Sequence, residues 1–240
     1  MFTHPELKRL YQCSPRFLRS SKAQNHAAIL YLNELLYERL FSNALARFGI
    51  ENRFYPIKSA ATFSLLYLVL RVVTELPVKR ILETGAGQTT LLLDALNKIR
   101  HCDIHTLEHD ASWATKIQSQ VAHPITHTTL IEKMIHGYNT LTYQASEDKP
   151  SQHFDLLIID GPVGNRRKSR WGCLEIIENV IADDFVIIFD DAARKGELET
   201  IEMAIRIMES QGISFSIGVT ESATSQCVLA GGKYADAAFY

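Results

Sequence analysis

The stretch of residues 78–93 constrains the fold of this chain more than any other part of the sequence. Its apolar run ends on Glu83, and Gly85 and Gly87 then allow a turn whose backbone angles a Cβ would resist. Leucines at helical spacing follow at once and would give a helix a broad apolar face for packing on a sheet. A strand, a glycine-rich turn and a helix in this order are typical of the first unit of a nucleotide-binding α/β fold.

The residues around this turn indicate which nucleotide it would hold. A dinucleotide brings an anionic pyrophosphate, which a carboxylate at Glu83 would repel, whereas S-adenosylmethionine brings an ammonium and a sulfonium. The third glycine of the dinucleotide motif is also missing, because Thr90 stands in its place. Thr89 and Thr90 suit the first turn of the helix that follows. The sequence therefore favours S-adenosylmethionine over a dinucleotide.

Acidic residues also end the later predicted strands of the sheet. Glu108 ends the second strand, where an acid can accept hydrogen bonds from ribose hydroxyls. Asp160 ends the apolar run 154–160, and Asp190 ends the run 184–190. The carboxyl ends of parallel strands meet at one edge of a sheet, so these carboxylates converge with the acid of the glycine turn. Their mutual repulsion favours a site that is shared with a cation.

The pattern of the other segments predicts the class of fold. The last two apolar runs, 214–219 and 225–230, have the spacing of a hairpin. A weaker strand is predicted over 125–131, and the polar stretch from there to His153 has no assignment. The sequence therefore predicts an α/β fold with a Rossmann-like, doubly wound, mostly parallel sheet and an antiparallel last strand. Helices are predicted over residues 23–48, 57–75, 111–121, 171–181 and 197–211.

The sequence also predicts a division into two parts. Residues 1–76 are expected to form an N-terminal helical extension, and residues 77–240 the cofactor-binding domain. The amphipathic helix over 23–48 is expected to cap the sheet or the pocket. A homodimer contact through the N-terminal helices and a substrate lid are the alternatives.

Composition excludes several classes of protein. A formal net charge of -2 argues against a nucleic-acid partner, for which a strong basic excess is expected. The most apolar window, residues 60–73, is too short to span a bilayer, and the first twenty or so residues lack the pattern of a signal peptide. The cysteines lie far apart, without metal or disulfide spacing, which predicts reduced thiols in a soluble, cytoplasmic protein with no membrane partner. They are Cys13, Cys102, Cys173 and Cys227.

The chain resembles the class I S-adenosylmethionine-dependent methyltransferases over residues 79–232. The resemblance rests on the run from Glu83 through Gly87, on Glu108, on the strand that ends at Asp160 and on the terminal hairpin. It implies a seven-stranded sheet whose last strand is antiparallel. It also implies S-adenosylmethionine as cofactor, held by Glu83, Gly85, Gly87, Thr89, Thr90, Glu108, His109 and Asp160.

Three stretches together look most like the small-molecule and sugar-directed branch of that superfamily: Leu-Glu-x-Gly-x-Gly-x-Thr-Thr over residues 82–90, Ile-Asp-Gly-Pro over 159–162, and the later run Phe-Asp-Asp-Ala-Ala-Arg over 189–194. The resemblance then implies methyl transfer to a hydroxyl of a small-molecule or saccharide acceptor, with Asp160 and Asp191 as catalytic residues. Divalent-metal-dependent O-methyltransferases carry acids at positions that match Asp160, Asp190 and Asp191, which implies an oxygen-rich site for Mg²⁺. The pair here is Asp-Asp rather than the commoner Asp-Asn, so metal dependence stays open.

Two features near this edge have open interpretations. The loop of residues 165–170 carries four cations, which either grip a phosphate or carboxylate of the acceptor or lie solvated. Tyr138 and Trp171 either stack on a ring of the acceptor or pack within the protein.

Other classes of function share parts of this pattern. An aminopropyltransferase would have the same fold, but Gly161 and Pro162 follow Asp160 where such enzymes usually carry a different pair. An NAD-dependent oxidoreductase is disfavoured by Glu83, by Thr90 and by the final hairpin. A non-catalytic binding protein with this fold stays an alternative.

Overall fold

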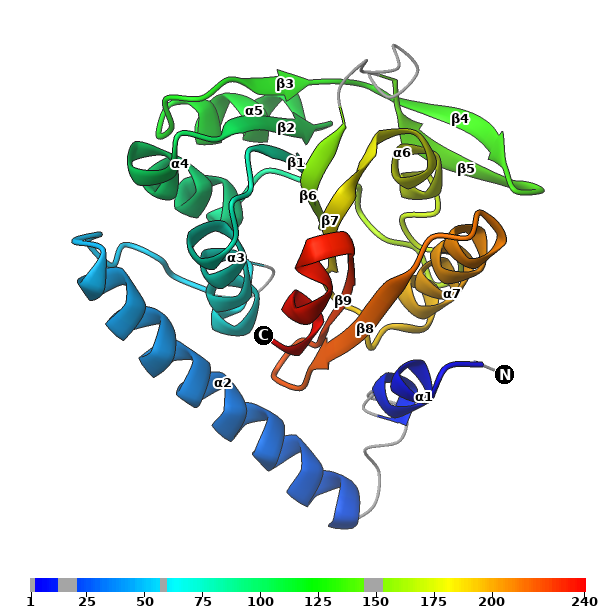
Figure 1. Cartoon of the computed structure of the whole chain (residues 1–240), viewed down its shortest axis with the longest axis horizontal. Helices are drawn as coiled ribbons and strands as arrows, with labels where there is room; N and C mark the ends of the chain where they lie inside the picture. Colours follow the sequence, from blue (N-terminus) through cyan, green and yellow to red (C-terminus); the bar gives the residue numbers. More distant parts are fainter. Residues whose placement is uncertain (1–2, 13–20, 57–59, 145–152) are drawn as a thin grey trace.

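The centre of the molecule is a seven-stranded sheet, seen in a computed structural model that describes residues 3–12, 21–56, 60–144 and 153–240 (Figure 1). Its strands are β1 (Arg80–Thr84), β2 (Asp103–Glu108), β3 (Ile125–His127), β6 (Phe154–Ile159), β7 (Ile181–Phe189), β8 (Phe215–Thr220) and β9 (Gln226–Gly231). Across the sheet they follow the order β3-β2-β1-β6-β7-β9-β8. All pairs are parallel except those of β9, which is antiparallel to both of its neighbours. The predicted fold class is confirmed, including the antiparallel last strand.

Both faces of this sheet are covered, because side chains alternate along each buried strand. In β6, Leu157 and Ile159 point into one core, while Leu156 and Ile158 point into the other. The first core contains α6 (Cys173–Val180) and α7 (Lys195–Ser210); the second contains α3 (Phe63–Glu75) and α4 (Gln88–Arg100). The sheet is therefore doubly wound, with helices on its two sides (Figure 1). Two further helices complete the domain: α5 (Ala111–Gln118) and the 3₁₀ helix η3 (Gly232–Phe239).

The N-terminal part adds two helices to this domain. α1 (Pro5–Gln12) buries Leu7 and Leu10 in the core around α7. α2 (Ser21–Arg47) lies along α3 and buries Phe41 and Leu45 in the other core (Figure 1). α3 is buried on most of its sides. The boundary predicted at residue 76 stays a prediction, since α3 packs together with α4 although it precedes that boundary.

One predicted strand was wrong, because the segment 125–131 contains parts of two strands. β3 ends at His127, and β4 (Leu130–Ile135) begins a separate two-stranded sheet with β5 (Tyr138–Tyr143). The two residues between β4 and β5, His136 and Gly137, both have positive φ, at 45° and 71°. Such a pair favours a tight hairpin turn. The stretch without an assignment therefore holds a hairpin as far as residue 144.

The start predicted for the helix over 57–75 was also wrong. α3 begins at Phe63, with Thr62 in extended conformation before it, and residues 57–59 lie outside the described part of the chain. A carboxylate from another helix stabilises this start, because Glu34 of α2 accepts a hydrogen bond from the Phe63 backbone N–H. The start is thus set by a tertiary contact with α2.

Three cysteines fall in the described part, and all three are buried free thiols; Cys13 lies outside it. Among the helices described, none is both long enough and apolar enough to cross a bilayer.

Candidate functional site

The glycine turn after β1 packs directly on the turn after β6. Gly85 has a φ of 89°, and its N–H donates to the carbonyl of Leu107 at 2.9 Å. A Cβ on Gly85 would lie 3.1 Å from the backbone carbon of Asp160, so the close approach of the two turns requires a glycine. Gly87 differs, because a Cβ built on it would have no atom within 4 Å. The turn is therefore closed toward β6 and open at Gly87.

Glu83 is fully buried beneath this turn and does not face the opening. Its Oε2 accepts hydrogen bonds from the hydroxyls of Thr90 at 2.8 Å and Thr106 at 2.9 Å, and its Oε1 accepts one from Thr89. Burial raises the pKa of Glu83 to about 7, against the opposing effect of these three hydroxyls. Glu83 thus ties β1, α4 and β2 together. The contacts with a cofactor expected for Glu83, Thr89 and Thr90 stay predictions.

Glu108 connects the end of β2 to the glycine turn. Its Oε2 accepts a hydrogen bond from the Ala86 N–H at 2.9 Å, and its Oε1 accepts from the backbone N–H groups of His109 and Asp110. The His109 ring stands beside it, with Nδ1 3.0 Å from Glu108 Oε1. The structure therefore places Glu108 and His109 at the turn, and their contacts with a cofactor stay predictions.

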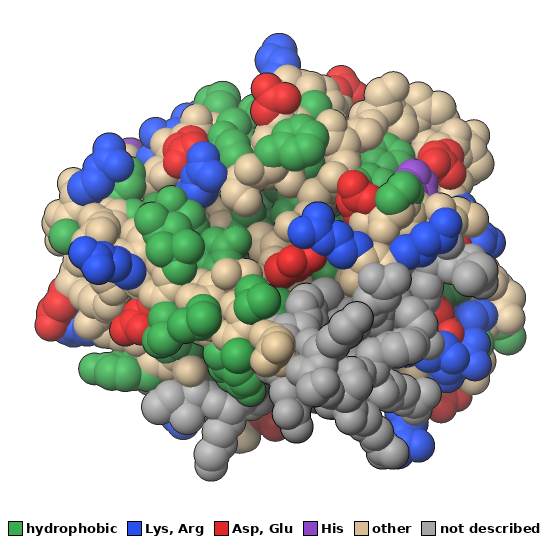
Figure 2. Space-filling model, turned by 90° about the horizontal axis from the view of Figure 1, so that it is seen from below, with side chains coloured by type: hydrophobic (Ala, Val, Ile, Leu, Met, Phe, Trp, Pro, Cys, Tyr) green, Lys and Arg blue, Asp and Glu red, His purple; other side chains and the backbone are tan. Residues whose placement is uncertain are grey.

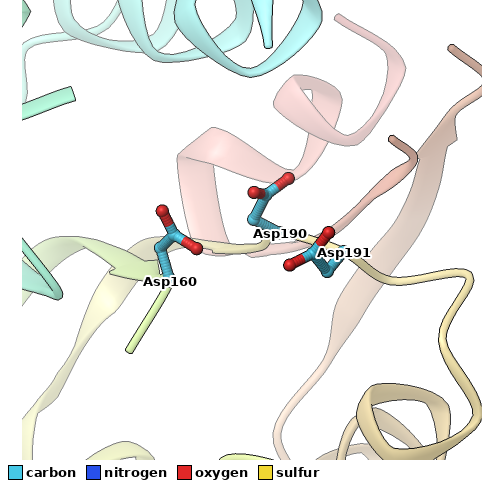
Figure 3. A group of neighbouring side chains, drawn as sticks. All are labelled: Asp160, Asp190 and Asp191. Carbon is cyan, nitrogen blue, oxygen red and sulfur yellow. The ribbon is translucent and has the colours of Figure 1, made fainter. Parts of the chain in front are cut away.

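Three carboxylates meet where β6 and β7 end (Figure 3). Asp160 follows β6, Asp190 and Asp191 follow β7, and one oxygen from each lies within 4.8 Å of the others. The Asp160 side chain is the most exposed of the three, at 25%. Enclosure by the protein, together with repulsion from Asp190, raises the pKa of Asp160 well above its ordinary value. The same two causes raise the pKa of Asp191 to about 6.

Arg170 is the cation that holds this cluster, which sequence reasoning did not anticipate. Its Nη2 donates to Asp160 Oδ1 at 3.1 Å and to Asp191 Oδ2 at 3.3 Å. Its Nη1 donates to the backbone carbonyls of Asp190 at 3.1 Å and Ile159 at 3.4 Å. The guanidinium therefore joins the ends of β6 and β7 and bridges two of the three acids.

Two neighbouring cations of the loop, Arg167 and Lys168, have structural partners as well. Arg167 forms an ion pair with Glu199, and the Lys168 ammonium lies 4.4 Å from the ring centre of Tyr138 and 4.5 Å from that of Trp171. Trp171 itself is buried in the core, and its Nε1 donates to the carbonyl of Ile135. Of the two readings of the aromatic pair, packing within the protein is therefore the one observed for Trp171.

Two further residues of the site had no signal in the sequence. Gln226, the first residue of β9, donates from Nε2 to Asp190 Oδ1 at 2.8 Å. Tyr143 ends β5 and is buried, with its hydroxyl so close to Gly161 that a Cβ there would lie 2.3 Å from it. Tyr143 can be identified as a site residue only once the β4–β5 hairpin is known, because that hairpin brings it to Gly161. Gln226 can be identified only once β9 is known to lie beside β7.

Comparisons with known proteins agree with this fold. A scan against models of protein families gives no match, and a comparison with curated proteins gives none either. Among solved structures, the chain is similar to a Staphylococcus aureus protein assigned as a caffeoyl-CoA O-methyltransferase, at 14% identity and a TM-score of 0.50. That match covers 83% of this chain and 100% of the other.

Two further solved structures contain S-adenosylhomocysteine. One is an O-methyltransferase from Bacillus cereus, at 16% identity and a TM-score of 0.47, covering 81% of this chain and 90% of that one. The other is the methyltransferase PaMTH1 of Podospora anserina, at 13% identity and a TM-score of 0.46, covering 82% and 88%. These two scores fall below 0.5, whereas the likeness to the Staphylococcus aureus protein and the strand order show a shared architecture and nothing of the activity. The fold is that of the class I S-adenosylmethionine-dependent methyltransferases.

Proposed function

We propose that this protein is an S-adenosylmethionine-dependent methyltransferase that acts on a hydroxyl of a small-molecule or saccharide acceptor. The observation that carries the proposal is the opening at Gly87, a residue whose missing side chain leaves free space in an otherwise packed turn. A buried carboxylate, Glu108, stands beside that turn, and Asp160 ends the neighbouring strand of the same sheet edge. These residues fit a cationic nucleoside cofactor with ribose hydroxyls. The saccharide or small-molecule acceptor rests on the resemblance of residues 82–90, 159–162 and 189–194.

In this proposal different residues bind the cofactor, accept the proton and position the charged groups. The backbone of residues 85–87 and the Glu108 carboxylate hold S-adenosylmethionine, which supplies an electrophilic methyl group when bound. Asp160 is the general base that accepts the proton of the acceptor hydroxyl, since its side chain is the most exposed of the acidic cluster and its pKa is raised. Asp191, which pairs with Arg170 and Arg194, positions these guanidinium groups. Magnesium assistance is not part of the proposal, because Arg170 already bridges two of the acids that would bind the ion.

Gly87→Val tests the cofactor site without disturbing the fold. The backbone of Gly87 is extended, with a φ of -177°, so valine fits there, and the space around it is open. We expect the free energy of unfolding to fall by no more than about 1 kcal/mol, the usual cost of a poorer N-cap, because Gly87 is the N-cap of α4. We expect the affinity for S-adenosylhomocysteine to fall at least about tenfold, because the isopropyl group occupies the opening. Isothermal titration calorimetry and urea denaturation of the two proteins measure both quantities, and a valine variant that binds like wild type contradicts the proposal.

The alternatives are separated by the same titration. A non-catalytic protein that uses this fold for another ligand would give no heat with S-adenosylhomocysteine at millimolar concentration. An aminopropyltransferase would prefer the decarboxylated cofactor, so a parallel titration with decarboxylated S-adenosylmethionine distinguishes it.

A further inference from the structure

We propose that the Arg170 guanidinium supplies, from within the chain, the positive charge that a divalent cation supplies in metal-dependent O-methyltransferases, so Asp160, Asp190 and Asp191 form no metal site in the intact protein. The proposal concerns the acidic cluster alone and does not depend on methyl transfer.

One carboxylate oxygen of each acid in the cluster already has a partner within the protein. Arg170 donates a hydrogen bond to Asp160 Oδ1 and another to Asp191 Oδ2. Arg194 also forms an ion pair with Asp191 Oδ2, at a distance of 2.7 Å from its Nη1. Asp190 Oδ1 accepts from the Gln226 amide at 2.8 Å. Mg²⁺ is held by one or two carboxylates and several waters in an octahedron at roughly 2.0–2.1 Å. Here one oxygen of each acid already has another partner, and the buried Arg170 guanidinium lies between Asp160 and Asp191, close to where the ion would lie.

The charges of the cluster are also largely balanced without a metal ion. Three buried or half-buried carboxylates require nearby positive charge, and Arg170 and Arg194 supply two guanidinium groups. Adding a divalent ion would leave the centre with a net positive charge beside a buried guanidinium. The Arg170 side chain is only 6% exposed, and its two hydrogen bonds to backbone carbonyls fix it between β6 and β7. It is therefore a permanent part of the cluster.

The test is a titration with MnCl₂ in which electron paramagnetic resonance measures the free Mn²⁺. Mn²⁺ prefers the same oxygen ligands as Mg²⁺. We expect the wild-type protein to show no stoichiometric binding. Arg170→Met removes the guanidinium at similar side-chain length and leaves the three carboxylates without their bridging cation. This variant should bind one Mn²⁺ at least about tenfold more tightly than wild type.

Arg167→Met is the matched control, because its guanidinium pairs with Glu199 and not with the cluster. It should behave like wild type in the titration. Stoichiometric Mn²⁺ binding by wild type that Asp190→Asn abolishes would overturn the proposal. A folded Arg170→Met variant that binds no Mn²⁺ would also overturn it. If circular dichroism shows that Arg170→Met does not fold, the wild-type and Asp190→Asn titrations decide alone, and no binding in either supports the proposal.

A different observation carries a second inference: we infer that α2 pairs with α2 of a second copy of this chain. The outer side of α2 exposes five large apolar side chains, between 37% and 64%: Ile29, Leu32, Leu35, Leu36 and Leu40. Figure 2, which views the molecule from the side of α2, shows hydrophobic side chains gathered on this face. The largest exposed apolar patch of a protein is often an interaction site.

The arrangement of this stripe fits a second copy of the same helix. Leu32 and Leu40 lie four residues on either side of Leu36, so an antiparallel pair places Leu36 on its own twofold axis and Leu32 against the partner's Leu40. Twofold interfaces require this self-complementarity. A stable dimer buries roughly 800 Å² per partner, so a polar rim would surround the five apolar side chains at this interface. A membrane surface fits less well, because only Lys22, Arg39 and Arg47 give α2 positive charge.

Size-exclusion chromatography with light scattering tests this pairing. We expect wild type at about 100 µM, above the Kd of an ordinary protein dimer, to have twice the 27.1 kDa mass of one chain. Leu32→Glu with Leu36→Glu should give a monomer of unchanged circular dichroism. Met134→Glu is the control, since Met134 is 65% exposed on β4 and should leave the dimer intact. A monomeric wild type, or a dimer that survives the double substitution, would overturn the inference.

Discussion

Asp160→Asn should lower the rate of methyl transfer by a factor of about 10² to 10⁴, the usual contribution of a positioned general base. An amide has the shape of the carboxyl group and can still accept the hydrogen bond from Arg170, but it cannot take the proton of a hydroxyl. Binding of S-adenosylhomocysteine should change little, because the glycine turn and Glu108 are untouched. The rate is measured as S-adenosylhomocysteine formed from S-adenosylmethionine, with the best acceptor of a panel of sugars and phenols.

Asp183→Asn serves as the matched control for this experiment. Asp183 is an exposed acid near the opposite end of β7, far from the carboxyl edge. Its variant should keep the wild-type rate. Were Asp160→Asn to retain a rate within about threefold of wild type, a loss far too small for a general base, Asp160 would not be the base.

Glu83→Ala should lower the free energy of unfolding by about 3–5 kcal/mol. The substitution leaves three buried hydroxyl groups, on Thr89, Thr90 and Thr106, without their acceptor, at about 1–3 kcal/mol each before relaxation, and it opens a cavity beneath the turn. Glu83→Gln keeps the volume and one acceptor oxygen, so its cost should be smaller. Urea denaturation gives the three free energies, and a loss below about 1 kcal/mol for the alanine variant contradicts this role.

The same residue predicts a dependence of stability on pH. The pKa of Glu83 is about 7 in the folded protein and 4.5 for an ordinary glutamate, so the folded state binds the proton more tightly. The stabilisation is complete below pH 4.5 and is lost as the pH rises through 7. Between pH 4.5 and pH 7 and above, the free energy of unfolding of wild type should fall by on the order of 3 kcal/mol more than that of Glu83→Gln. Glu132→Gln, at an exposed position on β4, should follow the wild-type curve, and parallel curves for wild type and Glu83→Gln would refute the assignment.

The parts of the fold that the sequence predicted correctly are those where one local rule dominates. Buried parallel strands are continuous apolar runs, and β6 and β7 were recognised for that reason. The β4–β5 hairpin escaped recognition because it is short and lies partly outside the main cores, with exposed positions such as Met134. The start of α3 depends on Glu34, a residue of another helix, so no pattern within residues 57–75 could reveal it.

In the candidate site, too, the sequence predicted the features that depend on a local signal and not those that depend on tertiary contacts. Glycines that permit a turn and acids that end strands are local signals, and the fold brings Gly85, Glu108 and Asp160 to one edge. The partners of charged groups are decided by tertiary structure. Sequence reasoning assigned Arg170 to a loop that was either solvated or aimed at a ligand, whereas the structure buries it among the aspartates. It also read Thr89 and Thr90 as helix-starting residues and missed their hydroxyl bonds to Glu83.

The insertion of β9 between β7 and β8 has a consequence for biosynthesis. β7 and β8 share no ladder of their own, so a nascent chain can attach β8 only after the residues from Gln226 onward have left the ribosome. Gln226 is also the residue that holds Asp190. A polypeptide whose translation stops before this point therefore has neither a finished sheet nor the hydrogen bond that holds the Asp190 side chain.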